Sequence, residues 1–265
     1  MTLPFVNVEY NGSRNCVSWQ GLSLCHGDNL SAFMRRDVAS RLHDTPGRDE
    51  FLSHLRGLAL IGMGKESLET VLNAEIPEER DWAVGEALAE ALLIRSHRVV
   101  FPWNMERDKR NAKGSLPGAD IVGFLPLDSG FRLGLGEVKT SSEEKYPPQV
   151  MSGRSGHLGH QIDKLAENMS TIYQLLKWLH PRCKGTEHQD AFDQSVSFYL
   201  NSGNKAASLF GILIRDTTPN ELDLQGRGKA LGRTVVHPAS CELIAVYLPC
   251  KIADLPSLTE EGGTA

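Results

Sequence analysis

Residues 77–180 alternate between two kinds of apolar spacing, in an order that few folds accommodate. The stretch 77–98, PEERDWAVGEALAEALLIRSHR, carries apolar residues at helical spacing and ends in basic residues. Three short apolar runs follow, VVFPW, ADIVGFLPL and FRLGLGEVKT, and the turn residues DSG join the second run to the third. Residues 156–180 return to helical spacing. This order predicts an α/β fold in which a helix, three strands and a second helix follow one another.

The flanking regions add further strands and an N-terminal extension. Residues 1–76 mix strand-like runs with a helical run at 29–44 and carry no catalytic motif, so we expect an α+β extension that binds a partner. Two apolar strands, SLFGILIRD and CELIAVYLP, follow residue 180, with a glycine-rich basic loop, LQGRGKALGR, between them. The predicted domains are the extension at 1–76, a main domain at 77–256 and a disordered tail at 257–265.

Charge and targeting signals narrow the functional classes. The 265 residues include 33 acidic residues against 28 Lys and Arg, a net charge of −5, so overall charge does not draw this chain to nucleic acid. DNA contacts would need local basic patches or a partner. The start, MTLPFVNVEYNGSRNC, lacks a signal-peptide pattern, and no apolar run reaches the roughly 18 residues of a membrane span. We therefore expect a cytoplasmic protein with no membrane contact.

The third predicted strand ends in GEVK, which places two ionisable side chains on one face of an apolar strand. Residues two apart in a strand project from the same face, so Glu137 and Lys139 point together while Val138 packs on the other side. The hairpin brings Asp120, at the start of the preceding strand, beside Glu137. The two carboxylates and the Val138 carbonyl are hard oxygen ligands for Mg²⁺. Lys139 would then orient or deprotonate the attacking water during phosphodiester hydrolysis.

The chain contains a second acid-x-Lys triplet, so this spacing alone is weak evidence for a catalytic site. Glu143 and Lys145 repeat it within SSEEKYPP, a polar stretch that ends in two prolines and reads as a solvated loop. Glu137 and Lys139 instead end an apolar strand, one hairpin after GAD. Context favours the first triplet as the site, against the alternative of a strand-end salt bridge.

The helix at 77–98 supplies a further candidate acid. Glu86 and Glu90 lie four residues apart on one face of an otherwise apolar run. Gly85 would let this helix approach the sheet closely, which favours Glu86 as the residue that completes the metal site. The other acid would pair with Arg95 or Arg98. Gln161, on the following helix, is either a ligand in the metal shell or a partly exposed polar residue.

On these residues the chain resembles the PD-(D/E)XK nuclease superfamily, through Glu86 or Glu90, GAD and GEVK, over roughly residues 80–180. Chain length, the long N-terminal zone and VGEALAEALL make it similar to the HamA/AbpA family, the nuclease subunits of Hachiman anti-phage defence. The resemblance implies a restriction-endonuclease-like core, with a central mixed β-sheet flanked by helices. It also implies Mg²⁺- or Mn²⁺-dependent cleavage of DNA, and a superfamily 2 helicase subunit, HamB-like, as partner.

The resemblance assigns each site residue a role. It implies catalysis by Asp120, Glu137, Lys139 and Glu86, and metal binding by Asp120, Glu137, Val138 and Glu86. The alternative is a non-catalytic subunit that keeps a nuclease fold and binds DNA or the helicase. Such a subunit would have lost an acid or the lysine, and this chain has all of them, which favours an enzyme. Exonuclease and endonuclease activity both remain open.

Overall fold

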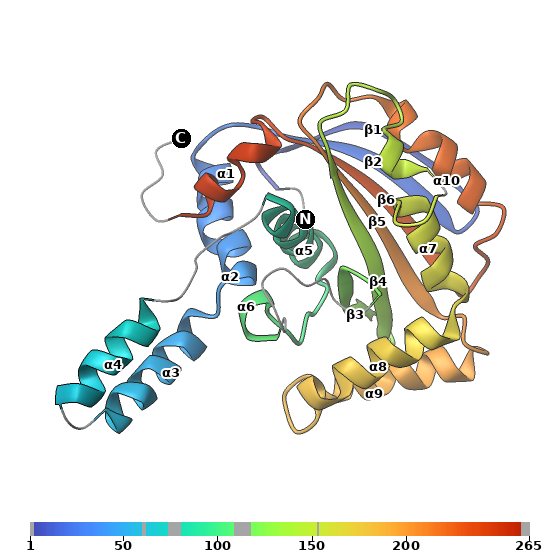
Figure 1. The fold of residues 1–265 in the computed structure, drawn as a ribbon. Helices are drawn as coiled ribbons and strands as arrows, with labels where there is room; N and C mark the ends of the chain where they lie inside the picture. Colours follow the sequence, from blue (N-terminus) through green and yellow to red (C-terminus); the bar gives the residue numbers. More distant parts are fainter. Residues whose placement is uncertain (1–2, 60–61, 74–80, 109–117, 153, 261–265) are drawn as a thin grey trace.

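The computed structural model describes residues 3–59, 62–73, 81–108, 118–152 and 154–260. Its centre is a six-stranded mixed sheet in the order β1-β2-β6-β5-β4-β3 (Figure 1). Strands β2, β6, β5 and β4 run parallel, and β1 and β3 join the two edges as antiparallel partners. The strands are β1 Val6–Arg14, β2 Val17–Leu24, β3 Ile121–Leu127, β4 Gly130–Ser141, β5 Ala207–Arg215 and β6 Ser240–Tyr247. Mixed α/β architecture is thus confirmed.

Helices cover both faces of the sheet. They are α1 Asp28–Phe33, α2 Ala39–Leu42, α3 Thr45–Leu58, α4 Gly62–Leu72, α5 Asp81–His97, α6 Met105–Asp108, α7 Leu158–Glu167, α8 Met169–Cys183, α9 Gln189–Asn201 and α10 Gln225–Leu231. Gly85 of α5 faces Thr140 and Ile214, whereas Gly211 of β5 faces Leu158 and Ile162 of α7. Because Gly211 and Ile214 differ in strand parity, α5 and α7 pack on opposite faces. In the described ranges no helix has both the length and the apolarity to cross a membrane.

Strands β3 and β4 form the predicted hairpin, but the VVFPW run is not a strand. Only Val100 forms a bridge, to Phe124. Pro102 has no amide hydrogen to extend the pairing, and Trp103 instead buries its indole, which donates to the Val122 carbonyl at 2.8 Å. Here apolar side chains fill the core without joining the sheet. Of the three strands predicted between the two helices, the structure therefore contains the second and third, β3 and β4.

The single helix predicted over residues 156–180 is two helices. Asn168 lies between α7 and α8 in an extended conformation, and its side chain accepts a hydrogen bond from the Thr171 amide at 3.0 Å. Asn168 is therefore the N-cap of α8. The apolar spacing continues across the break, so periodicity alone does not reveal it.

The boundary expected at residue 76 does not divide the sheet. Strand β2 pairs in parallel with β6, from Val17 with Cys241 to Ser23 with Tyr247. The helical run at 29–44 is present as α1, a five-residue π-helix at Met34–Val38, and α2. The first two strands and these helices are therefore part of one core with the rest of the chain.

Two further predictions were wrong. LQGRGKALGR, expected as a loop, forms α10, and a Cβ at Gly228 would lie 2.3 Å from the Trp19 ring. This glycine lets α10 pack directly on β2. The tail expected to be disordered from residue 257 begins in a 3-10 helix at Pro256–Leu258, and Thr259 is buried. Residues 261–265 lie outside the described residues, as do 77–80 of the predicted helix at 77–98.

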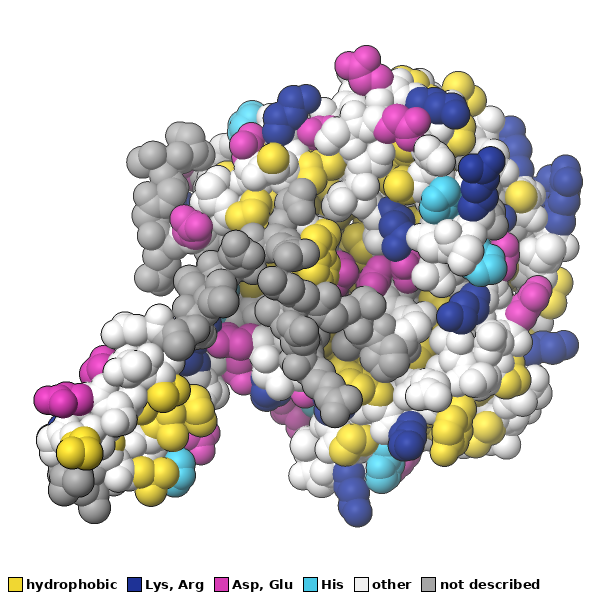
Figure 2. Space-filling model, in the orientation of Figure 1, with side chains coloured by type: hydrophobic (Ala, Val, Ile, Leu, Met, Phe, Trp, Pro, Cys, Tyr) yellow, Lys and Arg dark blue, Asp and Glu magenta, His cyan; other side chains and the backbone are white. Residues whose placement is uncertain are grey.

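Helices α3 and α4 form a hairpin that projects away from the sheet (Figure 1). Neither helix has a buried residue. Figure 2 shows apolar side chains on this hairpin at the protein surface. They include Phe51, Leu58, Met63 and Val71, with exposed fractions of 57%, 66%, 76% and 65%.

Candidate active site

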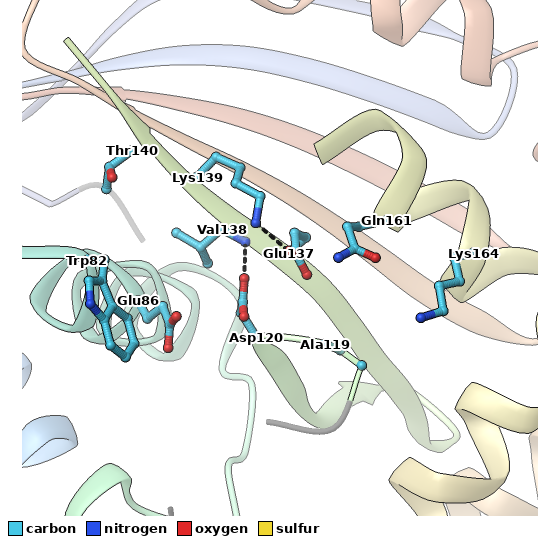
Figure 3. A pocket seen from close by; sticks show the side chains of 11 residues that line it. Trp82, Glu86, Ala119, Asp120, Glu137, Val138, Lys139, Thr140, Gln161 and Lys164 are labelled. Atoms are coloured by element: carbon cyan, nitrogen blue, oxygen red, sulfur yellow. Dashed lines mark hydrogen bonds and ion pairs between the residues drawn. The ribbon is translucent and has the colours of Figure 1, made fainter. Parts of the chain in front are cut away.

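The register of the β3–β4 hairpin places Asp120 beside Glu137. Ile121 pairs with Gly136, and the Asp120 amide donates to the Gly136 carbonyl at 3.0 Å. One Asp120 carboxylate oxygen then accepts a hydrogen bond from the Val138 amide at 2.9 Å (Figure 3). Asp120, the residue that precedes β3, is therefore held against the residues of β4 on either side of Glu137. The predicted juxtaposition of Asp120, Glu137 and Lys139 is present.

Glu137 is held in an environment that disfavours its charge. Only 4% of the residue is exposed, and burial raises the pKa of its carboxyl group to about 7. The neighbouring carboxylate of Asp120 adds to this rise, while Lys139, whose ammonium lies 2.5 Å from a Glu137 oxygen, opposes it. A Glu pKa near neutrality is typical of functional sites.

These residues line a cavity of about 600 Å³ between two helices. Helix α5 contributes Trp82 and Glu86 on one side of β4, and α7 contributes Gln161 and Lys164 on the other (Figure 3). Gly85 permits the close approach of α5, because a Cβ there would lie 2.9 Å from the Thr140 methyl group. That expectation is confirmed.

The two candidate acids of α5 have different surroundings. Glu86 lines the cavity, whereas Glu90 is fully buried and accepts a hydrogen bond from the Arg41 Nε at 2.6 Å. Arg41 also donates to the Trp103 carbonyl and stacks over the Phe101 ring, 5.2 Å from its centroid. The expected partner of the second acid, Arg95 or Arg98, was wrong, since Glu90 pairs with Arg41 of α2.

The second acid-x-Lys triplet lies outside this cavity. Glu143 and Lys145 are exposed in the segment after β4. The Glu143 carboxylate accepts a hydrogen bond from the Gln149 amide at 2.6 Å, which stabilises the local turn. The prediction of a solvated loop is confirmed.

The donor set for a metal ion consists of oxygen atoms. Val138 donates its amide to Asp120, and because the N–H and C=O of a strand residue point to the same edge, its carbonyl lies on the Asp120 side. Carboxylate and carbonyl oxygens suit Mg²⁺ or Mn²⁺. Within the described residues, however, no group of three or more His, Cys, Asp and Glu side chains is arranged to hold a metal. Glu86 therefore lines the cavity without forming a three-carboxylate cluster with Asp120 and Glu137.

Three lining side chains, Thr140, Trp82 and Lys164, were not predicted from the sequence. Trp82 precedes Glu86 by four residues and Lys164 follows Gln161 by three, so each shares a helix face with a residue that was identified. Helical periodicity from Glu86 and Gln161 would have found both.

Comparison of the chain with models of known protein families gives no match, and comparison with curated protein sequences gives none either. The chemistry of the cavity and the spacing of its residues therefore carry the functional assignment.

Substitutions at Glu86 and Glu90 will separate the two acids by stability. Glu90→Gln leaves the Arg41 guanidinium without its buried carboxylate, so we expect the free energy of unfolding to fall by about 3 kcal/mol. Glu86 is also buried but lines the cavity, so Glu86→Gln should lower the free energy of unfolding by less than Glu90→Gln does. Urea denaturation followed by circular dichroism measures both. Equal losses would contradict the separation of roles.

The raised pKa of Glu137 predicts a specific pH dependence of stability. The folded protein holds this proton up to about pH 7, whereas the unfolded chain releases it near the ordinary value of 4.5. The free energy of unfolding should therefore fall as pH rises from 4.5 to 7, by about 3 kcal/mol for this group. Glu137→Gln removes that component, so in EDTA the variant should lose less stability between pH 5 and pH 8 than the natural chain. Glu143→Gln, an exposed acid, serves as control and should retain the natural pH dependence.

Proposed function

We propose that this protein is a divalent-metal-dependent nuclease with a restriction-endonuclease-like core that hydrolyses phosphodiester bonds in DNA. The observation that carries the proposal is the meeting of Asp120, Glu137 and Lys139 in one cavity, where the start of β3 lies beside the last half of β4. This combination of two acids and a lysine suits hydrolysis at a phosphate.

The charges of the cavity support a bound cation. Its lining includes three carboxylates, Glu86, Asp120 and Glu137, against two lysines, Lys139 and Lys164. With all of them ionised the lining carries net negative charge and repels a phosphate. A bound divalent cation would make the net charge of the lining positive. It would also stabilise the ionised form of Glu137, which burial and the neighbouring Asp120 disfavour.

Each side chain has a role in this mechanism. Asp120, Glu137 and the Val138 carbonyl would hold Mg²⁺ or Mn²⁺, which when bound polarises the phosphate and lowers the pKa of water. Lys139 lies against Glu137 and orients or deprotonates the attacking water. Its charge also offsets the negative charge that develops on the phosphate. Glu86, across the cavity, would complete the metal shell through a bridging water.

Removing these groups should abolish cleavage without unfolding the protein. We expect Glu137→Gln and Lys139→Met each to lower Mg²⁺-dependent cleavage of plasmid DNA by at least about 100-fold, because each acts at the reacting phosphate. Glu143→Gln and Lys145→Met, the exposed triplet, are the matched controls and should cleave normally. Gel electrophoresis measures the rate and circular dichroism checks the fold. Retained cleavage by a purified Glu137→Gln/Lys139→Met double variant would show that these residues do not form the active site, and would exclude the proposed mechanism.

We further propose that the protein acts in the cytoplasm with a superfamily 2 helicase subunit in anti-phage defence, as its resemblance to the HamA/AbpA family suggests. Net charge of −5 gives little attraction to DNA, so a partner that grips DNA would deliver the substrate. The α3–α4 hairpin is the best candidate for the docking surface within the N-terminal zone. It exposes Phe51 and Met63 and buries no residue, whereas β1 and β2 are occupied in the sheet. Within the partner-binding extension predicted at residues 1–76, we therefore propose α3 and α4 as the part that contacts the helicase.

This assignment predicts which surface changes prevent complex formation. Phe51→Glu/Met63→Glu places charges on the exposed face of the hairpin, so we expect co-purification with the proposed superfamily 2 helicase subunit to fall at least tenfold. Leu200→Glu, at an exposed apolar position on α9, is the control. Cleavage of DNA by the isolated chain should be unchanged in both variants. Undiminished co-purification of the double variant would exclude the hairpin as the docking surface.

A further inference from the structure

Lys164 differs from Lys139 although both lysines line the same cavity. Lys139 forms a 2.5 Å ion pair with Glu137. Lys164 is partly buried on α7, and its ammonium forms no hydrogen bond or ion pair with any residue that the structure describes. Figure 3 shows its amino group directed toward the cavity, on the opposite side of β4 from Glu86. The cavity therefore contains one neutralised lysine and one that is available to a ligand.

The packing of α7 explains why this side chain reaches the cavity. Leu158, Ile162 and Leu165 form the buried face of the helix against the sheet. Lys164 lies at the edge of that face, one turn after Gln161. The adjacent acid, Asp163, is already paired with Arg227 at 2.5 Å. Among the described residues, neither Asp163 nor Glu167, three residues further along the helix, forms an ion pair with Lys164.

A partly buried ammonium without an acceptor loses hydration and gains nothing from the protein in return. An anion in the cavity would supply the missing acceptor. In a nuclease that anion is a phosphate of the bound strand, and a lysine binds phosphate as a compact point charge.

We propose that Lys164 binds a non-bridging phosphate oxygen of the DNA strand and positions it over Asp120 and Glu137. This inference rests on the proposed nuclease function and adds a residue outside GAD and GEVK. Lys164 is a substrate-positioning residue, whereas Lys139 acts on the water and the metal-site carboxylate. Lys164 therefore contributes mainly to DNA affinity, and Lys139 mainly to the rate of the chemical step.

The salt dependence of DNA binding tests this assignment. We would measure binding of a short fluorescent DNA duplex over a range of KCl concentrations in a Glu137→Gln background, which binds without cleaving. The slope of log K against log salt is negative, and the loss of one phosphate contact makes it less steep by about 0.9. We expect Lys164→Gln to show that decrease and Lys164→Arg to keep the original slope, because arginine retains the charge. Lys177→Gln, an exposed lysine of α8, is the control.

Steady-state cleavage by the chain with its natural Glu137 gives a second readout. Lys164→Gln should raise KM roughly tenfold and leave kcat within about twofold, since a charged hydrogen bond to the substrate is lost while the metal site is intact. An unchanged salt slope together with an unchanged KM would exclude the phosphate-binding role of Lys164, but it would not contradict the proposed nuclease function. Absence of both DNA binding and Mg²⁺-dependent cleavage in the natural chain would overturn the proposed function, and this inference with it.

Discussion

The hydrogen bond from the Val138 amide to the Asp120 carboxylate, 2.9 Å long, organises the candidate site. It joins the residue before β3 to the end of β4, where Glu137 and Lys139 project. Together with the hairpin register, it holds the Asp120 carboxylate beside Glu137, where Asp120 adds to the rise that burial causes in the pKa of Glu137. In the proposed metal site, a bound cation would offset this cost of charging Glu137. Positioning the ligands before the metal binds is the preorganisation that a metal site needs.

The rest of the fold fixes the strand that carries the site. Strand β4 lies between β3 and β5, and α5 and α7 approach it from opposite faces. Beyond Lys139, the buried Arg215 at the end of β5 donates to the Ser141 and Lys145 carbonyls and pairs with Asp223. The strand is thus held on both sides of GEVK. The cavity lies beside the start of β3, where Gly118, Ala119 and Asp120 form part of its wall.

Local sequence signals were sufficient for the hairpin and insufficient for longer-range packing. The turn residues and alternating pattern predicted β3, β4 and the meeting of Asp120 with Glu137, because each depends on neighbouring residues. The pairing of β2 with β6 joins residues more than two hundred positions apart, which no local pattern encodes. Gly228 was predicted to lie in a loop. This glycine instead allows α10 to pack against Trp19, which is far away in the sequence. The partner of Glu90 was missed for the same reason, since Arg41 arrives from a separate helix.

In the proposed nuclease, Asp120, Glu137 and the Val138 carbonyl form a divalent-cation site. Soaking crystals of the protein with Mn²⁺ and collecting diffraction data at the manganese absorption edge tests this site without reference to activity. We expect one strong anomalous peak in the cavity, at about 2.1 Å from an oxygen of each of these three residues, as expected for a small hard cation. A fully soaked crystal with no peak between Asp120 and Glu137, or with its only strong peak elsewhere, would exclude the proposed site.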